Sequence, residues 1–72
     1  MYKYYDVVWF VDGEEQGIEF GSYLKSEAKF EAEEFNYYPP EGEVYLIRER
    51  LTSEEPSSEV YTEDELKRIK KV

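Results

Sequence analysis

The chain has no cysteine and no histidine among its 72 residues. Disulfides, zinc fingers and most transition-metal sites are therefore excluded. Histidine is the common activator of nucleophiles and cysteine is itself a strong nucleophile, so nucleophilic catalysis by an activated side chain is not expected. The longest apolar run, Val7–Val11, is far too short to cross a bilayer. We expect no signal peptide, because Met1 leads straight into a strand-like segment.

Basic residues are also scarce, since nine Lys+Arg stand against eighteen Asp+Glu and give a net charge of -9. All eighteen acids lie between Asp6 and Glu65, where only four basic residues oppose them and the net charge is -14. Four basic residues then follow between Lys67 and Lys71. This balance argues against direct binding to nucleic acid, and we expect no membrane partner. It favours fast association with a strongly basic surface.

Aromatic residues make up 18% of the chain, and disordered acidic chains are poor in them. We therefore expect one folded domain over residues 1–72, near the lower size limit for folding without disulfides or metals. The absence of cysteine fits a reducing compartment, so we expect a cytoplasmic location, in the host cell if the protein is viral.

The N-terminal third of the sequence predicts a β-hairpin. Tyr4–Val11 is rich in β-branched and aromatic residues, and Asp12-Gly13 favours the positive φ angles of a tight type I′ turn. Glu14–Phe20 is the expected return strand. A two-residue turn predicts the following pairs on the core face: Trp9 with Gln16, Val7 with Ile18, and Tyr5 with Phe20.

The next segment predicts the main helix. Ser22 or Ser26 can cap a helix that runs to about Tyr37, and Pro39-Pro40 then stops it. The stripe expected to be buried comprises Leu24, Ala28, Ala32 and Phe35. A second stripe of Tyr23, Phe30 and Tyr37 either widens the buried face or binds a partner, and burial is favoured for Phe30.

The C-terminal third predicts a strand and a short helix. Glu43–Leu51 has apolar residues on both faces, which predicts a central strand, and Val60-Tyr61 can add a fourth. Thr62–Glu65 is a capping box that predicts a closing helix over Glu63–Lys71. The expected fold is α+β, with an antiparallel sheet of three to four strands, one main helix packed on it and a short C-terminal helix.

No catalytic or metal-binding pattern stands out among the carboxylates. Glutamate is so abundant that two neighbouring carboxylates do not predict acid–base chemistry, and the paired glutamates lack the spacing of a calcium-binding loop. We therefore predict no enzymatic activity, no cofactor and no metal site.

The acidic and aromatic side chains predict a protein-binding surface. Solvated glutamates are the ordinary interpretation of such a charge run. The functional interpretation is charge mimicry, because duplex DNA presents one phosphate charge per ~1.7 Å, and a row of carboxylates can imitate it. Steric blocking by the same surface is an alternative that the sequence hardly distinguishes from mimicry. The candidate partner-binding residues are Glu27, Glu31, Glu33, Glu34, Tyr37, Tyr38, Glu41, Glu54 and Glu55.

A second apolar sheet face is predicted from Val8, Phe10, Val44 and Leu46. The favoured interpretation is that the closing helix covers it with Leu66 and Ile69. The alternative is an open face that binds a partner or a second copy of the chain.

A resemblance to known proteins covers about a third of the chain. In spacing, the matching positions are Ser26-Glu27-Ala28, Ala32-Glu33, Tyr38-Pro39, Gly42-Glu43-Val44 and Ile47-Arg48, with one extra residue near Asn36. They resemble the small podophage inhibitor of bacterial RNA polymerase, and the order of elements looks like that of anti-CRISPR proteins. The resemblance implies a viral inhibitor of a host nucleic-acid-processing complex, and it implies no particular site residues.

Three hypotheses follow. The first is a non-enzymatic inhibitor, monomeric or homodimeric, that occupies a basic surface of a host complex, either by mimicking nucleic acid or by steric blocking. The second is a structural or oligomerising module that forms a homodimer through the second sheet face. The third is a small-ligand or nucleotide binder, which the negative charge and the lack of a phosphate-binding glycine loop oppose.

Overall fold

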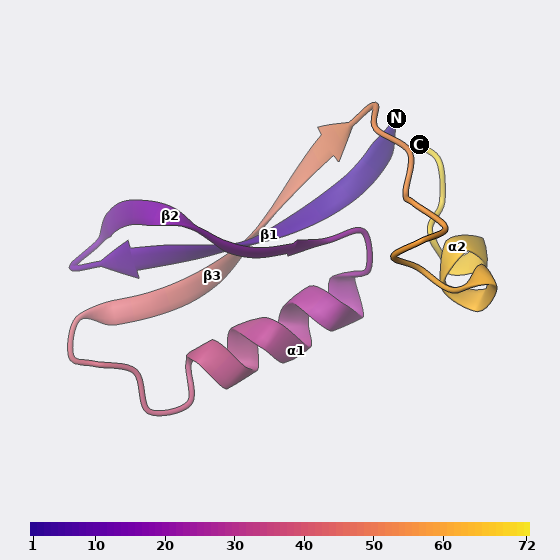
Figure 1. The fold of residues 1–72 in the computed structure, drawn as a ribbon. Helices are drawn as coiled ribbons and strands as arrows, with labels where there is room; N and C mark the ends of the chain where they lie inside the picture. Colours follow the sequence, from indigo (N-terminus) through magenta and orange to yellow (C-terminus); the bar gives the residue numbers. More distant parts are fainter.

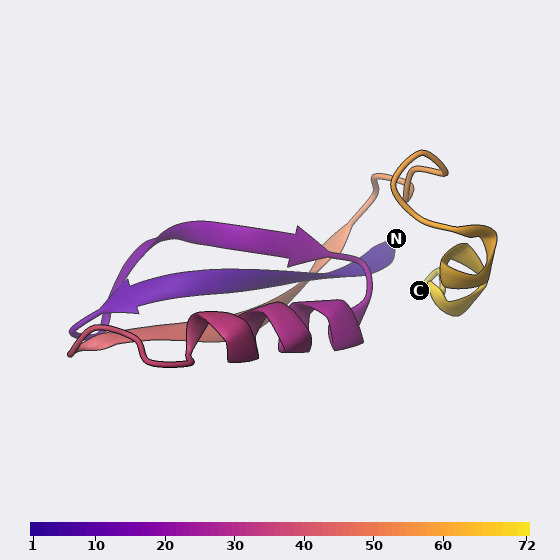
Figure 2. The same ribbon diagram turned by 60° about the horizontal axis from the view of Figure 1, so that its bottom comes forward.

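The computed structural model describes residues 1–72 and shows an antiparallel sheet with one helix along one face (Figures 1 and 2). The elements are β1 (Tyr2–Val11), β2 (Glu14–Ser22), α1 (Lys25–Phe35), β3 (Glu43–Thr52) and α2 (Glu63–Arg68). The strand order is β2-β1-β3, with both pairings antiparallel. The predicted α+β fold is confirmed, with three strands.

The central strand is β1, so the prediction of a central β3 was wrong. Tyr45 and Ile47 of β3 pack towards α1, whereas Val44 and Leu46 occupy the other face and are exposed. β3 therefore has apolar residues on both faces although it is an edge strand, with a neighbouring strand on one side only. Val60-Tyr61 forms part of a turn and not the possible fourth strand.

The hairpin register departs from the predicted one because β2 contains two bulges. The two-residue turn pairs Val11 with Glu14 as expected, but Trp9 pairs with Gly17 and Val7 pairs with Phe20. Each bulge adds one residue to β2, and such insertions increase the local twist of a hairpin. The predicted pair of Val7 with Ile18 is therefore wrong, because Ile18 is opposite Val8. Phe20 is instead placed against the core.

The core is small and lies between β1 and α1. Val7, Ala28 and Ala32 are its buried centre, and the half-buried side chains around it are Tyr5, Phe20, Phe35, Tyr45 and Ile47. The predicted helical stripe is thus confirmed, and its two alanines let the helix lie close to the sheet. Phe30 is 59% exposed, so its predicted burial was wrong.

The α1 helix is shorter than predicted. It begins after Leu24 with no side-chain cap, and the Ser22 hydroxyl instead accepts a hydrogen bond from the Leu24 N–H at 3.0 Å. It ends at Phe35 because the side chain of Asn36 turns towards β3. Neither α1 nor α2 has the length and apolar composition that crossing a membrane requires.

The α2 helix lies beyond the end of the sheet and packs against no other helix or strand (Figures 1 and 2). Its capping box between Thr62 and Glu65 is confirmed, but the helix ends at Arg68. The segment after it returns to the sheet, where Lys71 pairs with Tyr2. The prediction that this helix covers the second sheet face was therefore wrong.

Candidate functional site

One end of the sheet gathers acidic side chains and two exposed tyrosines, and we call it the acidic end. It is formed by the β1–β2 turn and the loop from α1 to β3, which lie together in Figure 1, and by the last turn of α1. Its members are Asp12, Glu14, Glu33, Glu34, Tyr37, Tyr38, Glu41 and Glu43. Residues 12–14 and 33–43 contain no lysine or arginine, so nothing within these segments neutralises the six carboxylates.

Backbone hydrogen bonds hold the two segments of the acidic end together. The Asp12 N–H donates to the carbonyl of Gly42 at 2.8 Å and joins the two segments. Within the second segment, the Glu43 N–H donates to the carbonyl of Pro40 at 3.1 Å. The indole N–H of Trp9 donates to Glu43 Oε1 at 2.6 Å. The carboxylates at this end therefore project from a frame that is tied to the sheet.

Asn36 fastens the helix side of the acidic end to β3. Its amide donates to the carbonyl of Tyr45 at 2.8 Å and accepts from the Tyr45 N–H at 2.9 Å, as a further strand would. The Phe35 ring stacks on the Tyr45 ring at 4.8 Å. Burial raises the pKa of the Tyr45 phenol, and the carboxylates of Glu43 and Glu19 raise it further, so this ring stays uncharged.

Tyr37 and Tyr38 stand out from the acidic end as a pair of rings. Their side chains are 74% and 87% exposed, and their ring centroids are 4.6 Å apart. Tyr38 has a φ of +59°, a left-handed conformation that costs energy in a residue other than glycine. Backbone strain of this kind clusters at functional sites.

The predicted partner-binding residues divide into two groups. Glu33, Glu34, Tyr37, Tyr38 and Glu41 meet at the acidic end, whereas Glu54 and Glu55 follow the far end of β3. The ten residues of β3 separate the two groups by about 33 Å. Glu27 and Glu31 lie along α1 and are half-buried.

Sequence reasoning missed three members of the acidic end. Asp12 and Glu14 belong to the correctly predicted hairpin turn, and Glu43 begins the predicted third strand. The signal that could have found them is the antiparallel pairing of β3 with β1, because it brings Glu43 opposite Val11 and beside the turn.

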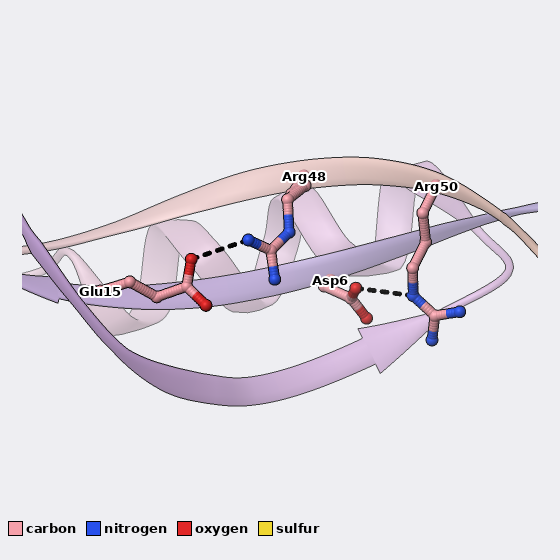
Figure 3. A network of polar contacts seen from close by, with 4 residues as sticks. All are labelled: Asp6, Glu15, Arg48 and Arg50. Carbon is pink, nitrogen blue, oxygen red and sulfur yellow. Dashed lines mark hydrogen bonds and ion pairs between the residues drawn. The ribbon is translucent and has the colours of Figure 1, made fainter.

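The second apolar sheet face is uncovered, and we call it the open face. Its exposed members are Ile18 at 53%, Leu46 at 51% and Val44 at 38%, and half-buried Phe10 lies among them. Val8 is only 1% exposed although no helix covers it. The Arg48–Glu15 ion pair, at 2.8 Å, joins the two edge strands across β1 at this point (Figure 3).

A second ion pair lies on the same face. Arg50 Nε donates to the buried Asp6 carboxylate at 2.8 Å (Figure 3). The Arg50 guanidinium also lies 4.6 Å from the centre of the Tyr4 ring. The hydrogen bond to Asp6 raises the pKa of Arg50 above its ordinary value. The acids and bases of the two pairs balance, so the open face carries no net charge from them.

A cluster of four tyrosines holds the chain at the end of the sheet opposite the acidic end. The Tyr23 ring makes edge contacts with the rings of Tyr2, Tyr4 and Tyr61 at 6.2, 4.8 and 5.7 Å. The Tyr61 hydroxyl accepts from the Tyr23 N–H, and the Tyr23 hydroxyl donates to the carbonyl of Glu54. These contacts explain why the segment after β3 stays at this end and carries α2 away from the open face.

Comparison of the chain with protein-family models, curated proteins and solved structures found no match.

Proposed function

We propose that the protein is a non-enzymatic binding module that uses its acidic end to engage a basic protein surface. The observation that carries the proposal is the coincidence of six carboxylates, two exposed tyrosine rings and no basic residue in segments 12–14 and 33–43. A solubilising surface needs the charge but has no use for exposed rings, since large exposed aromatics lower solubility. Their presence favours recognition.

The two tyrosines also favour a particular partner chemistry. Arginine guanidinium groups pair with carboxylates in a bidentate geometry and stack on aromatic faces, whereas lysine presents a strongly hydrated point charge. Tyrosine is common among the residues that dominate protein interfaces. An arginine-rich surface therefore fits the acidic end better than a lysine-rich one.

The narrower form of the proposal is a viral inhibitor that occupies the basic nucleic-acid-binding surface of a host complex, as anti-CRISPR proteins do. It rests on the sequence resemblance and on the negative charge, which imitates phosphates. The lack of cysteine, which fits a reducing compartment, is the reason to look for this partner in the cytoplasm.

The proposal is tested with nona-arginine as the probe and two charge-reversed variants of equal net charge. The first variant, Glu33→Lys/Glu34→Lys/Glu41→Lys, changes the acidic end. The second, Glu54→Lys/Glu55→Lys/Glu59→Lys, changes the far loop. We expect the first to weaken binding at least tenfold and the second to weaken it no more than threefold, as measured by calorimetric titration in about 0.15 M salt.

Two further measurements distinguish binding at the acidic end from a general attraction between the negative chain and a positive peptide. Tyr37→Ser/Tyr38→Ser keeps the net charge and should reduce the affinity for nona-arginine more than the affinity for nona-lysine. Affinity should also fall as salt is added, because exposed charges are screened over about 8–10 Å. Equal losses in the two charge-reversed variants would show that only the net charge matters, and the proposed site would then be abandoned.

A second candidate function is homodimerisation through the open face. It is favoured by the exposure of Ile18, Val44 and Leu46 and by the absence of any helix over them. Two copies of a chain with a net charge of -9 repel each other, but the open face carries two internally neutralised ion pairs. It is therefore a surface on which a second copy can dock at low electrostatic cost.

Light scattering over micromolar to millimolar concentration tests this candidate. A dimer that the Leu46→Glu variant abolishes would support it. Phe30→Glu is the matched control, because Phe30 on α1 is at least as exposed, at 59% against 51% for Leu46. A monomer at every concentration would remove the candidate and leave the acidic end as the proposed site.

A further inference from the structure

A hollow of about 500 Å³ lies between the tyrosine-bearing end of the sheet, the start of α1 and the C-terminal segment. Lys3 and Tyr5 form its side on β1, where β2 ends at Ser22, opposite Tyr5. Leu24 and Lys25 form the side at the start of α1, and residues 68–72 close the third side. Figure 1 shows the chain ends and α2 together at this end of the molecule.

The charge of this hollow is opposite to that of the whole chain. Five of the nine basic residues line it, and none of the ten lining residues is acidic. The five are Lys3, Lys25, Arg68, Lys70 and Lys71. None of them forms an ion pair, whereas Arg48 and Arg50 are both paired on the open face. Five unpaired cations around one concavity repel each other, and a bound anion would relieve that repulsion.

The rest of the lining is apolar or aromatic. It comprises Tyr5, Tyr23, Leu24, Ile69 and Val72. Leu24 is buried, Tyr5, Tyr23 and Ile69 are half-buried, and Val72 is exposed. A volume of about 500 Å³ lies within the range of ligand pockets, which are mostly apolar with a few charged groups that orient the ligand.

We propose that this hollow binds a small amphipathic anion, in which an apolar body carries a carboxylate or a phosphate. The apolar body would lie against Tyr5, Leu24 and Ile69, and the anionic group would face the surrounding lysines and Arg68. The site is separate from the acidic end and does not depend on the function proposed for that end. The net charge of -9 argues against an anionic ligand only when it is taken as an average, because this hollow is lined by a local cluster of positive charge.

The experiment uses the fluorescent anion 8-anilinonaphthalene-1-sulfonate, which joins an aromatic body to a sulfonate. Two lysines of the hollow have neighbours of equal charge outside it, so Lys25→Glu is matched by Lys29→Glu, and Lys70→Glu by Lys67→Glu. We expect one site per chain, with affinity reduced at least tenfold by Lys25→Glu and Lys70→Glu. The matched variants should change it less than threefold. Circular dichroism establishes that each variant is folded.

The source of the anion is distinguished by displacement of the bound dye. Displacement by dodecanoate assigns a carboxylate ligand, and displacement by adenosine monophosphate assigns a phosphate ligand. Displacement by neither, or equally well by uncharged dodecanol, would overturn the proposal. Equal losses in the matched variants would overturn it as well. So would loss of dye binding in Leu46→Glu, which would move the dye to the open face.

Discussion

Gly21 is the residue at which the sheet leaves no space for a side chain. A Cβ there would lie 2.5 Å from the Tyr4 hydroxyl and 2.6 Å from a carbon of its ring. Tyr4 cannot withdraw without cost, because its ring contacts Tyr23 and lies under the Arg50 guanidinium. That guanidinium also provides the partner of the buried Asp6 carboxylate. The absence of a side chain at Gly21 therefore leaves the space in which Tyr4 packs, and with it the contacts of Tyr4 with Tyr23 and Arg50.

Gly21→Ala should consequently lower the free energy of unfolding by about 1–3 kcal/mol, the usual cost of forcing extra volume into a packed site. Gly17→Ala is the matched control, because Gly17 lies in the same strand and a Cβ there would meet nothing within 4 Å. Urea unfolding of both variants measures the difference. If the two lost the same free energy, the packing of Tyr4 on Gly21 would contribute nothing.

At the scale of elements, the position of α2 is decided by the tyrosine cluster. The Tyr23 hydroxyl donates to the Glu54 carbonyl, and a phenolate cannot donate. Burial raises the pKa of Tyr4 and of Tyr23, with further increases from neighbouring tyrosines and acidic groups, so the fold favours the uncharged rings. A pKa raised on folding means that the stability it contributes is complete below the unfolded value of about 10. That contribution is lost as the pH rises through the higher folded pKa.

We therefore expect the thermal midpoint to change little between pH 7 and 9 and to fall above about pH 10. Tyr23→Phe removes the ionisable group, so it should be less stable than the unmodified chain at pH 8 yet lose less between pH 10 and 12. Tyr38→Phe, which changes an 87% exposed ring, should behave like the unmodified chain. An unchanged alkaline loss in Tyr23→Phe would contradict the role given to this ring.

Local patterns predicted the elements better than their arrangement. The Asp12-Gly13 turn, the alanine stripe of α1 and the capping box of α2 each depend on neighbours within a few residues, so the sequence shows them directly. The bulges of β2 and the edge position of β3 depend on pairing between distant segments. No local pattern marks Tyr61 as the anchor of the last segment.

The same distinction explains how much of the candidate site was predicted. The exposure of Tyr37 and Tyr38 follows from their place beside two prolines. The joining of Asp12 to Gly42 requires the loop to be folded back onto the hairpin. Glu41 precedes β3 and Glu54 follows it, so the full length of this strand separates the two carboxylates. Counting charges along the sequence does not show this distance.

At the scale of the whole molecule, the chain is an elongated body of 39 × 20 × 17 Å with different chemistry at its two ends. Six carboxylates and two tyrosines gather at one end, and five unpaired cations surround the hollow at the other. The net charge of -9 describes neither end. Our central proposal is that recognition of a basic partner is localised at the acidic end.

The most direct test of that claim is the footprint of nona-arginine on the backbone amide signals of the protein in an NMR titration. We expect the largest shifts to fall in residues 12–14 and 33–43 and to shrink as salt is added. Tyr37 and Tyr38 should be among the most affected. Shifts of equal size around Glu54, Glu55 and the start of α2 would contradict it, because they would show attraction to acid wherever it occurs.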